Sequence, residues 1–413
     1  MVSKYSLSNI WCITPDTIIK NTSVQVNESK IAGIGGKAET VYKSPERNYL
    51  YPALINIHDH FRGNYLPRVG PPEGTYYLNW APWDADLKSS DIYAERANIS
   101  VEDCYSLSAY KNVFSGVVTS NDHFPHELND DILPTLPMRA ITDYTLAHEC
   151  SSYDLKWGDG IEIEHKRAVD GNIPFITHLE EGFDEESQQG IEILEKLNCL
   201  DEHCVLIHCI GFSDADIRKA NDAGAHIAWC PASNIFMFNV TCKIRKMIEA
   251  GLNISIGTDS THTGSVNLLQ EMRYAREVYH SMYGEPLPAK KVVEMVTVNP
   301  AKAFRMDDVT GSVEKGKLAD LLLLQPACSD PYEALLQAEP KDIALLLQEG
   351  KPLVGDPMYK ELFQSSGIEY NEIVLQGKPK LAKGDPEGLL KRVRENIGFE
   401  KELDYIPIDV QNV

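Results

Sequence analysis

Metal-binding side chains recur in this chain at the ends of four apolar runs. His58 and His60 end PALINIHDH, His178 ends PFITH, His208 ends VLIH, and Asp259 follows the glycine of ISIGTD. Imidazole and carboxylate groups suit zinc and similar divalent cations, and a catalytic site keeps one coordination position open for water. The residue types and their order therefore predict a metal centre that activates water for hydrolysis.

Each of these residues also has a plain structural explanation. His58 and His60 are two residues apart, so a strand would point both to one face, where they could serve only as polar packing. His208 could be a hydrogen-bonded core histidine, a further ligand, or a group that bonds the attacking water or a substrate oxygen. Asp259 is poorly placed for an apolar core, which favours ligation.

Glu181 is the candidate proton carrier. It follows His178 by three residues, an odd offset that would put it on the opposite face of a continuing strand. A turn at Glu180–Gly182 would bring the carboxyl back toward the cation, as a general acid/base requires. The alternative is one solvated acidic run from Glu180 to Glu186, in which Glu180 is the expected surface residue.

Four residues near the same strand ends are candidate substrate contacts. Asn234 in CPASN could bond a substrate or fix a loop, and His123 could line the pocket or be an ordinary loop histidine. Trp83 could stack on a flat substrate or anchor a lid. Arg62, like Arg68 in the same loop, could hold an anionic substituent.

The segment that carries these residues, 52–305, alternates short apolar runs with helical patterns, which is typical of βαβ units and a parallel sheet. A barrel of parallel strands brings many strand ends to one mouth. The expected strands are ALINIHDH, GVVTSNDH, RAITDYT, PFITHLE, CVLIHCI, HIAWCPA and ISIGTD. An eighth is expected between Tyr144 and Ile173, at SSYDLKW, before the helical IEIEHKRAVDG.

The two chain ends, 1–51 and 306–413, read as strands and turns instead. Hairpin patterns are SVQVNESKIAGIGG, LQEGKPLVGDP and LQGKPKLAKGDP, with a further strand in GSVEKGKLADLLLL and a helix at EGLLKRVREN. Because chain termini usually lie close together, we expect both ends to form one small β-sandwich domain beside the α/β barrel of 52–305.

Composition narrows the class of protein. A net charge of −22 argues against nucleic acid or an anionic membrane as partner. Nine cysteines without a CxxC pair indicate reduced thiols in a cytoplasm, and no apolar run reaches the length of a membrane helix. HExxH, PCxxC and GxSxG are absent. We expect a cytoplasmic enzyme with a small-molecule substrate, and leave a homodimer open.

Seven motifs in order resemble those of the amidohydrolase superfamily, above all its cyclic-amidine and purine/pyrimidine deaminases and triazine hydrolases. They are PALINIHDH, HLEEG, IHC, CPASN, GTDS, NPAKAF and GSVEKGKLADLLLL, from about residue 7 to about 357. The resemblance implies a distorted (β/α)8 TIM-like barrel with a β-sandwich. It also implies site roles: metal ligands at His58, His60, His178 and Asp259, a metal, water or substrate contact at His208, and a proton shuttle at Glu181.

The resemblance has informative departures. Binuclear members bridge their metals with a carboxylated lysine on the fourth strand, but neither Lys156 nor Lys166 ends an apolar strand here. We therefore expect one divalent ion, zinc, with iron as the alternative. HFRGN after the first ligands differs from the commoner versions, which indicates a different substrate, and Asn239 stands where a glycine usually follows CPASN. The expected activity is hydrolytic deamination of a heterocyclic amidine. The alternatives are hydrolysis of a cyclic amide or carbon–halide bond, and an inactive binding scaffold.

Overall fold

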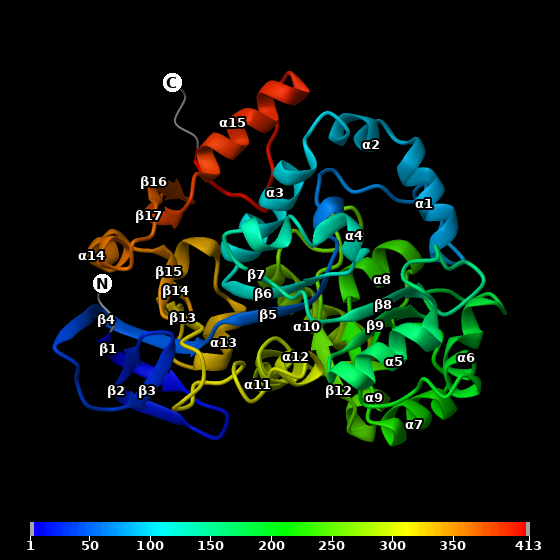
Figure 1. The fold of residues 1–413 in the computed structure, drawn as a ribbon, viewed down its shortest axis with the longest axis horizontal. Coiled ribbons are helices and arrows are strands. Elements are labelled where there is room, and N and C mark those ends of the chain that lie inside the picture. The colour runs from blue at the N-terminus through cyan, green and yellow to red at the C-terminus, as the bar shows by residue number, and fades with distance from the viewer. Residues whose placement is uncertain (1–3, 410–413) are drawn as a thin grey trace.

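The computed structural model describes residues 4–409, in which both chain ends contribute to one nine-stranded sheet (Figure 1). Its order is β16-β17-β15-β14-β13-β4-β1-β2-β3. These strands are β1 (Lys4–Ile13), β2 (Ile18–Asn27), β3 (Lys30–Ile34), β4 (Thr40–Pro52), β13 (Leu321–Leu324), β14 (Ile343–Gln348), β15 (Lys351–Gly355), β16 (Tyr370–Leu375) and β17 (Lys378–Lys383). Antiparallel pairing of β4 with β13 joins the N-terminal part to the C-terminal part. The β-structure expected from both ends is present; the exact division at residues 51 and 305 stays a prediction.

The three expected hairpins are β2–β3, β14–β15 and β16–β17. The two similar GKP sequences turn through two residues that both have positive φ, Glu349–Gly350 (51° and 74°) and Gln376–Gly377 (48° and 78°). Two-residue loops of this kind match the twist of the flanking strands and favour glycine at the second position. The repeated sequence thus encodes a repeated turn.

Eight parallel strands form the α/β half, in a three-stranded and a five-stranded group. They are β5 (Leu54–Asp59), β6 (Val117–Asp122) and β7 (Arg139–Ala140), then β8 (Thr145–Glu149), β9 (Phe175–Leu179), β10 (Cys204–His208), β11 (His226–Trp229) and β12 (Asn253–Ile256). The Asp259 N–H, after β12, donates to the His58 carbonyl of β5 (3.1 Å), which brings the first and last strands together. Ile55, Leu146, Ile176 and Val205, from both groups, share one buried apolar cluster. The strands therefore enclose a common interior, as in the expected barrel.

Helices separate the strands and cover them (Figure 1). They are α1 (Trp80–Ser89), α2 (Asp91–Arg96), α3 (Val101–Val113), α4 (His126–Asn129), α5 (Ile161–Gly171), α6 (Gly190–Lys196), α7 (Asp214–Ala223), α8 (Pro231–Phe238), α9 (Ile244–Ala250), α10 (Leu268–Tyr283), α11 (Ala289–Glu294), α12 (Val298–Ala303), α13 (Pro331–Leu336), α14 (Lys360–Ser365) and α15 (Pro386–Ile397). Local signals set their ends: α7 begins at a Ser213–Asp216 capping box and ends at Gly224 in the left-handed conformation. Among residues 4–409 no helix is both long and apolar enough to span a bilayer.

The eighth strand lies within the expected interval but not at SSYDLKW, so that placement is wrong. It is β8, Thr145–Glu149, and residues 151–157 form turns and irregular chain. The apolar run RAITDYT, expected as one strand, is divided: β7 covers only Arg139–Ala140, and the next strand begins at Thr145. The connecting residues 141–144 include the buried Ile141 and Tyr144, so this connection looks like part of a strand in the sequence. The helix expected at 161–171 is present as α5.

Candidate metal centre and active site

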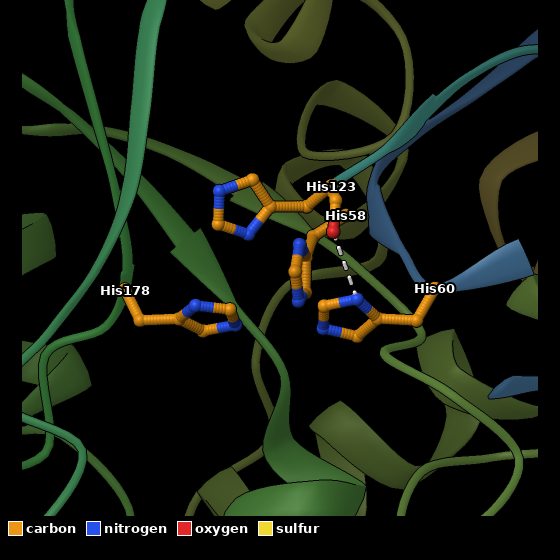
Figure 2. Close-up of side chains that lie close together, drawn as sticks. All are labelled: His58, His60, His123 and His178. Carbon is orange, nitrogen blue, oxygen red and sulfur yellow. Dashed lines mark hydrogen bonds between the residues drawn. The ribbon is translucent and has the colours of Figure 1, made fainter. Parts of the chain in front are cut away.

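The predicted ligands converge at the carboxyl ends of the parallel strands. Ligand atoms of His58, His60, His178 and His123 lie within 4.8 Å of one another, and those of His58, His208 and Asp259 do the same. Figure 2 shows the first four imidazoles around a common space, with His58 between the others. The Nε2 atoms of His58 and His60 lie 3.9 and 3.7 Å from Asp259 Oδ1. The two groups share His58. The five residues predicted as ligands, His58, His60, His178, His208 and Asp259, therefore lie around one region, together with His123.

Hydrogen bonds fix the tautomer of three of the imidazoles. Nδ1 of His60 bonds the His123 carbonyl (3.0 Å), and Nδ1 of His178 bonds the His148 carbonyl (2.7 Å). Nδ1 of His208 bonds the side-chain oxygen of Asn234 (2.8 Å). A carbonyl oxygen only accepts, so each Nδ1 carries the proton and each Nε2 keeps a free lone pair. Metal-ligating histidines are oriented in the same way.

His58 provides the test of whether a cation fits. Its ring is fully buried, yet neither nitrogen finds a hydrogen-bond partner among the described residues. Burial, reinforced by the neighbouring imidazoles of His60 and His123, holds the pKa of His58 well below 6.5, so the ring is neutral. Buried polar atoms without partners are rare and costly. Coordination of a divalent cation would satisfy the free nitrogen, and the donor set fits such an ion.

Asp259 supplies the negative charge of the cluster. Its backbone has φ 53°, which turns the chain at the end of the β12 segment and directs the carboxylate inward. Burial raises its pKa, but the His60 and His208 rings and hydrogen bonds from Ser233 Oγ (2.7 Å) and the Ser260 N–H (2.6 Å) outweigh burial and leave the pKa below 3.8. The group is therefore an anion held in a fixed orientation.

The turn that Glu181 needs is present. Glu180 adopts φ 53°, and the Glu181 carboxyl returns to the cluster, with Oε1 3.5 Å from His208 Nε2. Burial, then the negative charges of Asp259 and Glu149, raise the pKa of Glu181 well above 4.5. A carboxyl group with a raised pKa holds a proton readily, which is the property of a proton carrier.

The expectation that Glu180 is a surface residue is wrong. Its side chain is buried, and Oε1 accepts a hydrogen bond from the Ile191 N–H (3.2 Å) in the first turn of α6. Burial raises its pKa to about 8. The left-handed turn sends two successive carboxyl groups in different directions, one to the metal region and one to the start of α6, where backbone N–H groups are free to donate hydrogen bonds.

A cavity of about 360 Å³ opens above the cluster. His60, His178, Glu181, His208 and Asp259 line its base. The wall contains aromatic and basic side chains from α1, from α2 and from the segments after β5, β6 and β8. They are Arg62, Trp80, Trp83, Lys88, Tyr93, Arg96, Phe124 and Trp157. This volume is within the range of pockets for small molecules.

The four candidate substrate contacts divide into two pairs. Trp83 and Arg62 line the cavity. Asn234 is not among its lining residues: its oxygen orients His208 and its amide donates to Thr241 Oγ1 (2.9 Å). His123 is fully buried, with its Nε2 bonded to the Ala147 carbonyl (3.2 Å), and belongs to the imidazole cluster. Asn234 thus orients the His208 ring, and the backbone carbonyl of His123 orients the His60 ring.

Sequence reasoning missed His148, which lies near the carboxyl end of β8 and lines the cavity. Its ring lies 4.6 Å from the rings of both Trp80 and Trp157. The Leu155 N–H donates to its Nδ1 (3.4 Å), so Nε2 carries the proton, and burial lowers its pKa to about 3, which keeps the ring neutral. The signal was a histidine directly after Leu146 and Ala147, but this segment fell between the two expected strands, RAITDYT and SSYDLKW.

Comparison with known proteins agrees with this geometry. The model of the Amidohydrolase family matches residues 158–353, which include His178, Glu181, His208 and Asp259. Over 411 residues the chain is 26% identical to a 5'-deoxyadenosine deaminase of Methanosarcina acetivorans, with 84% of this chain and 92% of that protein covered. The chain is thus similar to the amidohydrolase family over this region and to deaminases over most of its length.

Two solved structures show the same fold. An adenosine deaminase from Xanthomonas campestris, crystallised with bound zinc, superposes with a TM-score of 0.71 at 16% identity, covering 95% of this chain and 97% of that one. A triazine hydrolase from Arthrobacter aurescens gives 0.74 at 17% identity, covering 96% and 99%. Together with the cluster of candidate ligands, these similarities support a hydrolase of carbon–nitrogen bonds other than peptide bonds, with a divalent metal centre and a small-molecule substrate.

Proposed function

We propose that this chain is a zinc-dependent hydrolytic deaminase that releases ammonia from an aminated nitrogen heterocycle. The observation that carries the proposal is the position of the Glu181 carboxyl, 3.5 Å from His208 Nε2 and at the base of the cavity, beside the ligand cluster. A proton carrier beside a water-activating cation is what hydrolysis of an amidine requires. The deaminase names of the relatives and the zinc in the adenosine deaminase structure support the same reading.

The cation would be held by His58, His60, His178 and Asp259, with His208 beside it. When bound, such an ion supplies Lewis acidity that lowers the pKa of a coordinated water from 15.7 towards about 7. Glu181 takes a proton from the attacking water and delivers it to a ring nitrogen of the substrate. The water oxygen forms a bond to the amidine carbon, the carbon–amino bond breaks, and the amine leaves as ammonia with a second proton.

The other residues of the site orient this reaction. His208 accepts a hydrogen bond at Nε2, because Asn234 holds the proton on Nδ1. The anionic Asp259 stabilises positive charge as protons move. Trp80, Trp83 and Trp157 form flat apolar walls that suit a heteroaromatic ring and exclude water from it. The neutral His148 offers an N–H donor to that ring.

The direct test is Glu181→Gln, which keeps the shape and removes the exchangeable proton. We expect the metal content to stay that of the wild type and kcat for ammonia release to fall by roughly 10²–10⁴-fold. Glu185→Gln is the matched control, because Glu185 lies in the same acidic run but is exposed. Unchanged turnover in Glu181→Gln would remove Glu181 from the mechanism.

The substrate is found by screening the metal-loaded protein for ammonia release. Aminated purines, pyrimidines and triazines form one panel, and cyclic amides and chlorinated triazines form the second. Ammonia from the first panel supports deamination, whereas ring opening or chloride release alone would favour the other hydrolases. Elemental analysis of the purified protein distinguishes zinc from iron. All nine cysteines are unpaired thiols, which supports a cytoplasmic setting.

A further inference from the structure

The cavity contains two arginines without a carboxylate partner. Arg62 lies in the short 3₁₀ turn Phe61–Gly63, directly after the ligand His60, and Arg96 is the last residue of α2. Both line the cavity that Glu181 lines. Within residues 4–409, no carboxylate oxygen lies within 4.0 Å of either guanidinium group. Lys88, on the same wall, differs because Asp84 neutralises it at 2.6 Å.

The contacts of these arginines leave their charge uncompensated. Arg96 Nη1 lies 2.9 Å from Nε2 of His262, and its guanidinium lies 4.9 Å from the Tyr93 ring centroid. Burial, then the charge of Arg96, lowers the pKa of His262 to about 3, so this ring is neutral. Arg62 lies over Phe124 at 5.9 Å. Aromatic faces and a neutral imidazole attract a cation weakly, but none of them is an anion.

The two guanidinium groups also raise each other's energy. Burial lowers the pKa of Arg96, and the nearby positive charge of Arg62 lowers it further. Arg62 is exposed and Arg96 is half-buried, and an anionic ligand in the cavity would stabilise both positive charges. In a chain with 61 acidic and 39 basic residues, carboxylates to pair with them are plentiful, yet none of the described carboxylates does so. Nδ1 of the buried His262 likewise has no hydrogen-bond partner among the described residues.

Charge is thus divided within one cavity. Glu181 and Asp259 lie at the base beside the ligand cluster, whereas Arg62, Arg96 and His262 offer donors on the wall. Arginine presents a planar set of N–H donors that matches carboxylate and phosphate oxygens. A ligand that satisfies both parts has a neutral aminated ring at the base and an anionic group at the wall.

We propose that the natural substrate carries an anionic oxygen group, a carboxylate or a phosphate, and that Arg62 and Arg96 bind this group while the aminated ring faces Glu181. This inference rests on the proposed deaminase function, since it takes the position of the ring from it. It predicts that the enzyme prefers an acidic substrate to the matching neutral one. It also assigns Arg62 and Arg96 as residues that determine specificity.

The test uses three probes that differ in charge at one end: 5'-deoxyadenosine, adenosine-5'-carboxylic acid and adenosine 5'-phosphate. Dissociation constants are measured by calorimetry on the zinc-loaded Glu181→Gln protein, and kcat/KM for ammonia release on the wild type. We expect at least one anionic probe to bind about 10-fold or more tightly than 5'-deoxyadenosine, because hydrogen bonds between charged groups are stronger than those between neutral ones. The carboxylate and phosphate arms show which anion the wall accepts.

Variants assign the preference to residues. Arg62→Gln and Arg96→Gln should each weaken binding of the preferred anionic probe by about 10-fold and change binding of 5'-deoxyadenosine by less than about 2-fold. Arg62 is exposed, so its variant tests the proposal even if Arg96→Gln fails to fold. Lys88→Gln is the matched control: it removes a charge from the same wall, but one that Asp84 already neutralises, and should keep the preference.

The outcomes separate this inference from the proposed function. Deamination of 5'-deoxyadenosine without any preference for the anionic probes overturns the inference and leaves the deaminase function intact. If an anionic probe binds in a way that depends on the arginines but no ammonia is released, the inference stands and the proposed deaminase function fails. Equal binding of all three probes, or a preference that neither arginine variant reduces, overturns the assignment of Arg62 and Arg96.

Discussion

Lys111 of α3 offers the sharpest test of how the fold supports the site. Its ammonium group is fully buried and bonds both oxygens of Asp59 (3.0 and 3.1 Å). It also donates to Asn64 Oδ1 (3.0 Å), Thr258 Oγ1 (3.0 Å) and the carbonyl of Asp259 (3.2 Å). These partners lie around the ends of β5 and β12, the segments that carry His58 and Asp259. Lys111 therefore joins two ligand-bearing segments below the cluster.

Lys111→Met keeps the length of the side chain and removes its charge. The Asp59 carboxylate would then stay buried with only amide donors from Asn56, Asn64 and Asn112. Breaking a buried ion pair on one side costs about 3–5 kcal/mol. For 413 residues, with an unfolding entropy of about 2.1 cal/mol/K per residue, the total is about 0.87 kcal/mol/K, so this loss lowers Tm by about 3–6 °C if unfolding is one transition.

The assay is a calorimetric melt of the zinc-loaded wild type, Lys111→Met, and the double variant Asp59→Asn/Lys111→Met. The double variant leaves no unpaired charge and should recover a large part of the lost stability. We also expect weaker zinc binding in Lys111→Met, because the Asp259 backbone loses an anchor. A single variant that melts within about 1 °C of the wild type, or a double variant that melts well below the single one, would refute this reasoning.

Two further predictions concern orientation and pH. Asn234→Ala frees the His208 ring and should lower kcat/KM by about 10–100-fold, with folding checked by circular dichroism; an unchanged value would show that the hydrogen bond does not position His208. Burial raises the pKa of Glu271 from 4.5 to about 7, so the folded chain keeps a proton that the unfolded chain releases between these values. Between these two pH values the free energy of unfolding of the wild type, relative to that of Glu271→Gln, should therefore fall by about 1.4 kcal/mol per pH unit, and it should level off above them. Urea midpoints measured at each pH would show this. A difference that does not change with pH would contradict the raised pKa of Glu271.

The sequence by itself determined the class of fold and the set of candidate ligands. The alternation of apolar strands with helical segments is visible in the local sequence. In a barrel of parallel strands, the carboxyl ends of all strands lie on the same side, whatever the connecting segments are. His58, His60, His178, His208 and Asp259 could for that reason be chosen before any contact was known. The hairpins β14–β15 and β16–β17 could also be predicted from the sequence, because the conformation of a two-residue turn depends mainly on the turn residues themselves.

Only the tertiary structure decided how neighbouring groups divide their roles. Glu180 and Glu181 are identical in type, and a left-handed φ at the first of them, stabilised by contacts distant in sequence, decides which one faces the cavity. Asn234 supports His208 instead of lining the cavity, and Arg62 and Arg96 share a wall without a carboxylate, because of where segments far apart in the chain come to lie. Local sequence specifies strands and turns through nearby backbone and side-chain preferences. Charge pairing and hydrogen bonding across the barrel depend on distances in space, which single-sequence patterns do not contain.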